Sequence, residues 1–185
     1  MIKPEIRVLG VDDGKFTPHT QGNSMVVGVV FRGGTSIDGV MHTKIAIDGL
    51  DATDKIAEMI TASPHRRQLR VVMLYGITFA GFNLVDIQKL HHITKLPVIV
   101  LTHDKPDLNA IQDALTHLPN MEERWRIVQN AGEIHPIRNK GAKLYMGLAG
   151  ITLQDAQKIV NLTSTRGSFP EPLRVAHLIA SGITT

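Results

Sequence analysis

The chain of 185 residues contains no cysteine, few aromatic residues and no long apolar run. The lack of cysteine excludes disulfide bonds, thiolate catalysis and zinc sites built from thiolates. Because aromatic residues make up only 4% of the chain, a broad base-stacking surface of the single-strand-binding kind is not expected. No apolar run approaches the roughly 20 residues that cross a bilayer, and the first residues do not form a signal peptide. We therefore expect no membrane partner and a cytoplasmic location.

What the chain does contain is typical of a globular protein, with 43% hydrophobic and 20% charged residues. The length predicts one domain, residues 1–185, which is large enough to bury a core. The net charge is +3 when the histidines are neutral. A mildly basic chain permits a polyanionic partner without requiring one.

The order of the predicted elements indicates a three-layer α/β fold. Three β-rich segments with short connections favour an antiparallel meander at 6–11, 24–32 and 39–48. Strands and helices then alternate, with strands at 70–75 and 98–101 and helices at 51–62, 83–93, 106–118, 121–131, 152–163 and from 168 onward. Right-handed crossovers predict a mixed five-stranded sheet of order 3-2-1-4-5 with helices on both faces. The segment 144–148 is a candidate edge strand.

A set of aspartates is predicted to gather where the parallel strands end, namely Asp12, Asp13, Asp48, Asp51 and Asp54. Carboxylates brought together repel one another unless protons or a cation neutralise them. Because Mg²⁺ and Mn²⁺ prefer oxygen ligands, this edge is a candidate site for either ion, with Asp12, Asp13 and Asp48 as ligands. The alternative is local structure alone, in which Asp-Gly pairs form turns and Asp51 and Asp54 favour the start of a helix.

The loop after the fourth strand contains Thr78, Phe79, Phe82 and Asn83. Two phenylalanines beside a catalytic edge could hold a base that has been flipped out of a duplex. The alternative is that the rings pack the loop onto the core and that Asn83 caps the helix that follows.

His177 lies in the last predicted helix, at the margin of an apolar stripe formed by Leu173, Ala176, Ala180 and Ile183. It is either a packed border residue or a general acid or base that faces the aspartates. Arginines and lysines elsewhere in the chain, Arg124 among them, are either phosphate contacts or part of a solvated basic surface.

Five segments together resemble a known family: Gly10-Val11-Asp12-Asp13-Gly14, Asp48-Gly49-Leu50-Asp51-Ala52-Thr53, Gly76-Ile77-Thr78-Phe79-Ala80-Gly81-Phe82-Asn83, Lys105-Pro106-Asp107-Leu108 and Pro170-Glu171-Pro172-Leu173-Arg174-Val175-Ala176-His177. The family is the largely archaeal endonuclease dU family, which is similar to endonuclease V and is grouped with the ribonuclease H-like nucleases. The resemblance covers almost the whole chain, and its Ala-Gly-Phe-Asn and Pro-Glu-Pro segments are the specific ones. It implies a ribonuclease H-like fold and a DNA-repair endonuclease that uses Mg²⁺ or Mn²⁺ to cleave DNA at deaminated bases, uracil in particular.

The resemblance also implies roles for single residues. The aspartate that ends the first strand in endonuclease V falls on Asp12, and the acidic or histidine residue of its last helix falls on His177. Its glutamate near the first helix has no exact match, and Asp54, Asp51 or Asp48 could serve; we take Asp54 as the third catalytic candidate.

Tyr75 departs from the family pattern, because endonuclease V has an aspartate at the end of the fourth strand. Tyrosine is neutral at pH 7 and is a poor Mg²⁺ ligand. Asp13 or Asp48 are candidate substitutes. If neither substitutes, the chain is a weakened or inactive relative that binds nucleic acid or nucleotides. A phosphohydrolase of small molecules is a third hypothesis.

Overall fold

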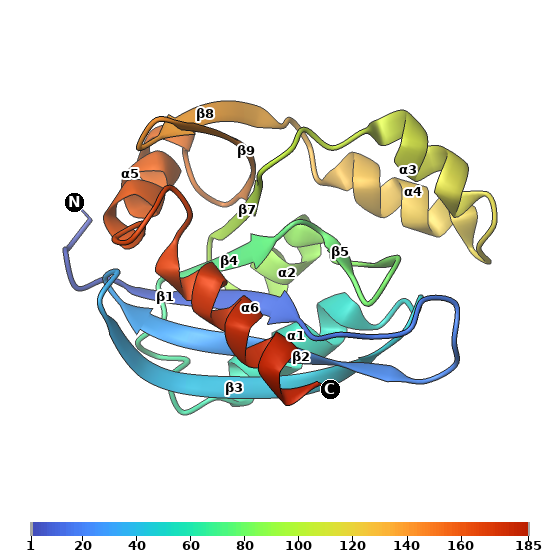
Figure 1. The fold of residues 1–185 in the computed structure, drawn as a ribbon, viewed down its shortest axis with the longest axis horizontal. Helices are drawn as coiled ribbons and strands as arrows, with labels where there is room; N and C mark the ends of the chain where they lie inside the picture. The colour runs from blue at the N-terminus through green and yellow to red at the C-terminus, as the bar shows by residue number, and fades with distance from the viewer. Residues whose placement is uncertain (1, 185) are drawn as a thin grey trace.

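The computed structural model describes residues 2–184, which build three layers around a mixed seven-stranded sheet (Figure 1). The sheet has the order β3-β2-β1-β4-β7-β9-β8. Its strands are β1 (Arg7–Asp13), β2 (Asn23–Arg32), β3 (Ser36–Ala46), β4 (Val71–Tyr75), β7 (Val98–Thr102), β8 (His135–Asn139) and β9 (Ala142–Ala149). Two short strands, β5 (Thr78–Phe79) and β6 (Asn83–Leu84), form a separate hairpin in the predicted loop.

The predicted order of the first five sheet strands is confirmed. Strands β1, β4 and β7 run parallel, and β2 runs antiparallel to both β1 and β3. The sheet is wider than predicted, because β9 pairs with β7 and β8 pairs with β9. Strand β8 was missed because its short sequence contains Pro136 and buries only Ile137 and Asn139. Proline lacks an N–H group and is tolerated at a sheet edge, where β8 lies.

The helices are α1 (Ala52–Ala62), α2 (Ile87–Thr94), α3 (Leu108–Leu115), α4 (Met121–Asn130), α5 (Leu153–Thr163) and α6 (Glu171–Ile183). Figure 1 shows α6 crossing one face of the sheet, α1 and α2 behind it, and α3 and α4 as a hairpin at one end. Three predicted helix starts were wrong. Helix α2 begins at Ile87 and is capped by Asp86, and α3 begins at Leu108 after its cap Asp107. Helix α6 follows Pro170 without a side-chain cap from Ser168. The predicted cap of α5 by Thr152 is confirmed.

The alternation of side chains along β1 decides what faces each helix layer. Leu9 and Val11 belong to the core under α1 and α2, whereas Val8 packs with Leu173 of α6. Asp12 therefore lies on the α6 face of the sheet and Asp13 on the opposite face.

Gly10 lets α6 lie directly against β1. A Cβ atom at this position would sit 2.2 Å from the carbonyl carbon and oxygen of Pro172. Only a glycine permits so close an approach of two backbones. The first turn of α6 is thereby fixed over the middle of β1, and the next turn reaches the end of that strand.

Within residues 2–184, no helix is both long enough and apolar enough to span a membrane.

Candidate active site

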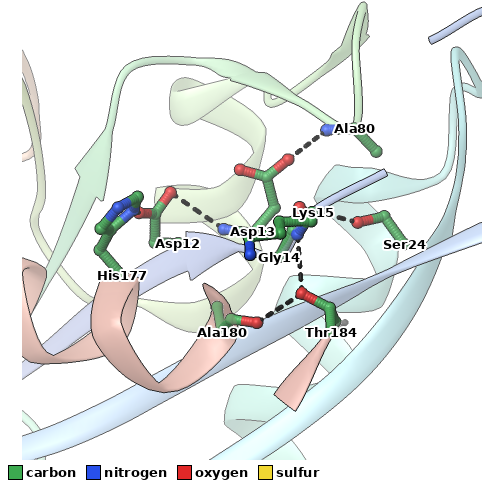
Figure 2. A network of polar contacts seen from close by, with 9 residues as sticks. All are labelled: Asp12, Asp13, Gly14, Lys15, Ser24, Ala80, His177, Ala180 and Thr184. Carbon is green, nitrogen blue, oxygen red and sulfur yellow. Dashed lines mark hydrogen bonds and ion pairs between the residues drawn. The ribbon is translucent and has the colours of Figure 1, made fainter. Parts of the chain in front are cut away.

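The site is organised around a hydrogen bond between Asp12 and His177 (Figure 2). Asp12 is the penultimate residue of β1, and His177 stands in the second turn of α6. The Nδ1 atom of His177 lies 2.9 Å from Oδ2 of Asp12. The carboxylate is buried, whereas the imidazole is 63% exposed. A buried acceptor therefore orients an exposed ring, which is the arrangement that a general acid or base needs.

The pKa of Asp12 is raised from 3.8 to about 6, mainly by burial and also by the charge of Asp13. The hydrogen bonds from the Asp13 amide and from His177 oppose this rise in pKa. Burial also raises the pKa of Asp13. Two adjacent carboxylates that resist ionisation are a pair that a cation would stabilise.

The donor set fits Mg²⁺ or Mn²⁺, which commonly use one or two protein carboxylates and retain water. Oδ1 of Asp12 accepts from the Asp13 amide at 2.9 Å, and Oδ2 of Asp13 accepts from the Ala80 amide at 2.6 Å (Figure 2). A carboxylate offers about four lone-pair positions, so these bonds leave room for a metal ion. Within residues 2–184, however, no three His, Asp or Glu side chains are grouped to hold a metal. The predicted cluster of Asp12, Asp13 and Asp48 is thus not assembled.

Asp48 instead holds the hairpin loop. Its Oδ1 atom accepts from the Phe82 amide at 2.9 Å, and its backbone amide donates to the carbonyl of Ala80 at 2.9 Å. Gly81 lies so close that a Cβ there would be 2.2 Å from the same Oδ1 atom. Asp13 and Asp48 consequently clamp one loop from two directions.

Asp51 and Asn83 form a second internal link. Nδ2 of Asn83 donates to Oδ1 of Asp51 at 2.6 Å, and its Oδ1 accepts from the amide of Ala52 at 2.9 Å. Asn83 does cap a helix, but the helix is α1 rather than α2. Asp51 occupies the N-cap position of α1 without making a side-chain cap bond.

Asp54 is not brought to the Asp12–His177 pair. Its Oδ1 atom lies 2.7 Å from Nζ of Lys89, in an exposed ion pair that joins α1 to α2. The structure thus gives Asp54 a surface partner on the helix layer of the opposite face.

The four loop residues predicted to bind a base are placed differently from one another. Phe79 and Asn83 are completely buried and have no surface on which a base could stack. Phe82 packs partly buried against the cluster under α4, and Thr78 is exposed. Of the four, Thr78 lines a hollow together with Asp12 and Asp13.

Two hollows meet at Asp12 and Tyr75. The first, of about 290 Å³, is also lined by His103, Phe169, Arg174 and His177. The second, of about 470 Å³, is also lined by Asp13, Thr78, His103 and Lys105. Burial, Asp12 and Asp104 raise the pKa of Tyr75, so its hydroxyl stays protonated and supplies no carboxylate-like charge.

Sequence reasoning missed His103 and Phe169 as site residues. His103 follows β7 directly, two positions after Leu101, which shares the α6 face of the sheet. Strand periodicity could therefore have placed His103 beside Tyr75. Phe169 had no such signal, because its position depends on where the loop before α6 runs.

Arg124, predicted as a surface cation, is buried. Its guanidinium donates to the backbone carbonyls of Asp48 at 2.6 Å and of Gly49 at 2.9 Å, and also to Phe82 at 2.5 Å. Burial lowers its pKa. Arg124 joins α4 to both loops that border the site and is not a phosphate contact.

The sequence model of a protein family described as endonuclease dU matches residues 4–184 of this chain. The chain belongs to the endonuclease dU family. A UPF0215 protein of Methanothermobacter thermautotrophicus is 50% identical over 184 residues, which cover 99% of this chain and 90% of that protein. A protein of unknown function from Archaeoglobus fulgidus, solved by crystallography, is 44% identical, with a TM-score of 0.88 over 96% of this chain and 98% of that one.

The fold extends beyond this family. Endonuclease V of Ciona intestinalis, solved in complex with DNA that contains an inosine, has a TM-score of 0.59 at 14% identity, over 92% of this chain and 82% of that one. At this identity the likeness concerns the fold. It confirms the expected ribonuclease H-like architecture for this endonuclease dU family member.

Proposed function

We propose that this protein is a Mg²⁺- or Mn²⁺-dependent endonuclease of DNA repair that cuts DNA at a deaminated base, uracil in particular. The observation that carries the proposal is the Asp12–His177 hydrogen bond of 2.9 Å at the carboxyl ends of the parallel strands. In open α/β sheets this edge is where ligands bind. The solved complex of Ciona endonuclease V with inosine-containing DNA supports the choice of substrate class.

In this proposal Asp12 and Asp13, which line one hollow, would hold the metal ion, and the ion would supply positive charge for the scissile phosphate and lower the pKa of water. His177 exchanges a proton with the attacking water or with the leaving oxygen, and Asp12 keeps its ring oriented. The hollow beside Thr78 takes the altered base. Extrusion of a base costs a few kcal/mol and less for a mispaired one, which favours damaged positions.

The test uses labelled duplex and single-stranded DNA with one uracil or one hypoxanthine, incubated with Mg²⁺, Mn²⁺ or a chelator. Asp12→Asn is compared with Asp155→Asn, since Asp155 is an exposed carboxylate paired with Lys158 on α5. We expect metal-dependent incision by the wild type and by Asp155→Asn, and none by Asp12→Asn. Equal incision by Asp12→Asn would refute the assignment.

Tyr75 favours a second candidate function, a nucleic-acid-binding protein without nuclease activity. The protonated tyrosine stands at the end of β4, beside Asp12, where endonuclease V has a carboxylate. Salt-sensitive binding of DNA without incision in any metal would favour this candidate. Gain of incision in Tyr75→Asp would then identify the missing ligand.

A further inference from the structure

Three rings pack together beside Asp12, although aromatic residues are scarce in this chain. The ring centroids of His103 and Phe169 lie 4.5 Å apart with 28° between the planes, a stacked pair. Tyr75 meets both rings edge-on, at 5.4 Å from Phe169 and 6.0 Å from His103. We call these three residues the aromatic shelf.

The topology explains why the shelf stands at the site. Tyr75 ends β4 and His103 follows β7, and these parallel strands are neighbours that bring both residues to one edge of the sheet. Side chains alternate between the two faces of the sheet, and both residues lie on the face that α6 covers, as Asp12 does. Phe169 comes from the loop that enters α6, the helix that supplies His177.

One ring of the shelf packs against the core, and the other two rings are exposed. Phe169 is partly buried against the core cluster that contains Met73 and Leu101. Tyr75 is 39% exposed, and His103 is exposed as well. The three rings line the hollow of about 290 Å³ that Asp12 and His177 also line. An open aromatic surface inside a hollow of this size suits one planar ring with its attached sugar.

The cation Arg174 also lines this hollow. Arg174 gives Nε and Nη2 to the buried carboxylate of Glu171, with the shorter bond at 2.6 Å. These hydrogen bonds hold the guanidinium in place and raise its pKa. Its Nη1 atom makes no hydrogen bond within residues 2–184, which leaves a donor for a phosphate oxygen.

We propose that the aromatic shelf stacks one unpaired nucleobase of the DNA strand whose scissile phosphate lies at Asp12. This inference rests on the proposed function for the position of the phosphate, and it adds a substrate requirement. The base at the shelf must be out of the duplex, because the neighbouring base pairs cover both faces of a base that is stacked inside it. The substrate is thus a single strand or a frayed segment. The altered base occupies the second hollow, on the other side of Tyr75.

A shelf with only a structural role would tie the loop after β7 to the loop before α6. That role predicts lower stability on loss of a ring, with no dependence on which nucleotide of a bound strand lacks its base. The two roles are therefore separable by the position of an abasic nucleotide.

The experiment measures binding of fluorescent single-stranded DNA in chelator by anisotropy, with one abasic nucleotide moved stepwise from a fixed uracil. Wild type is compared with Phe169→Leu and His103→Ala, and with Trp125→Leu as the matched control. Trp125 is a half-buried ring on α4 that lines neither of the two hollows at Asp12. Thermal unfolding of each variant shows whether the fold is intact.

We expect one abasic position to weaken wild-type binding by roughly fivefold to a hundredfold, the range for loss of one stacked base. That position should lose its effect in Phe169→Leu and His103→Ala and keep it in Trp125→Leu. The proposal is overturned if the abasic position still weakens binding in both shelf variants. It is also overturned if no abasic position weakens binding by the wild type. If the protein does not incise DNA but one abasic position still weakens its binding, the nuclease proposal is refuted and the stacking proposal holds.

Discussion

The imidazole of His177 hydrogen-bonds to the carboxylate of Asp12 across 165 residues of sequence. The contact exists because α6 lies against β1 at Gly10, with the backbone of Pro172 where a side chain would otherwise be. A strand end and a helix face, each ordinary alone, are thereby joined by one hydrogen-bonded pair of side chains.

Gly10→Ala should damage both the fold and this contact. The added methyl group must displace the first turn of α6, and overpacking of this kind costs about 1–3 kcal/mol or more. The free energy of unfolding in urea should fall by at least that amount, and incision should fall with it. Gly182→Ala in α6 is the control, since a Cβ there meets nothing within 4 Å and alanine favours helix. A Gly10→Ala variant as stable as wild type would contradict the close approach.

The buried Asp12 carboxyl should make stability depend on pH. Its pKa is raised in the folded state, from 3.8 to about 6, so the folded state binds more protons than the unfolded state between these values. The contribution of Asp12 to stability is thus fully present below pH 4 and is lost as the pH rises through about 6. The difference amounts to roughly 3 kcal/mol. In chelator, Asp12→Asn should match wild type near pH 4 and exceed it by up to that amount near pH 7. Parallel stability curves for the two proteins would show that the pKa is not raised.

Metal binding should offset the loss of stability that ionised Asp12 causes at neutral pH. At pH 7, Mg²⁺ or Mn²⁺ should raise the melting temperature of the wild type, because a ligand at 100 times its Kd stabilises by about 2.7 kcal/mol. Asp12→Asn should show a much smaller shift, and Asp155→Asn the full shift. Equal shifts in all three proteins would place the ion elsewhere. This measurement needs no DNA and no activity.

Removal of the His177 side chain should slow incision without unfolding the protein. His177→Ala is expected to lose roughly 10²- to 10⁴-fold in rate, the usual contribution of a general acid or base. The imidazole is 63% exposed, so little packing is lost. His92→Ala, at an exposed position on α2, should retain full activity. A His177→Ala variant with wild-type rates would assign the proton transfer to another group.

Arg124→Met should be among the most damaging substitutions outside the site. It leaves buried carbonyl oxygens without donors, each at about 1–3 kcal/mol. The loss of unfolding free energy should therefore exceed about 2 kcal/mol. Arg126→Met, at an exposed position on the same helix, should stay within roughly 0.5 kcal/mol of wild type. Chemical denaturation of both variants distinguishes a structural arginine from a surface one.

Local pattern was enough to predict much of this protein. Apolar strands, their spacing and the rule of right-handed crossovers led to the order β3-β2-β1-β4-β7. The same reasoning placed Asp12 at the edge where parallel strands end, and the family resemblance singled out His177. These features depend on periodicity and chain direction, both of which are properties of neighbouring residues.

Tertiary contacts decided the rest. Asn83 caps α1, whose first residue is 31 positions away, and Arg124 is buried because distant loops offer it carbonyl oxygens. The aromatic shelf joins the ends of two strands to a loop more than sixty residues further along the chain. A local pattern states which residues a segment can bury, but not which distant group will satisfy a hydrogen bond or complete a packed cluster. The sequence by itself determined the order of five sheet strands and pointed to Asp12 and His177 as site candidates, and only the three-dimensional packing decided which partners surround them.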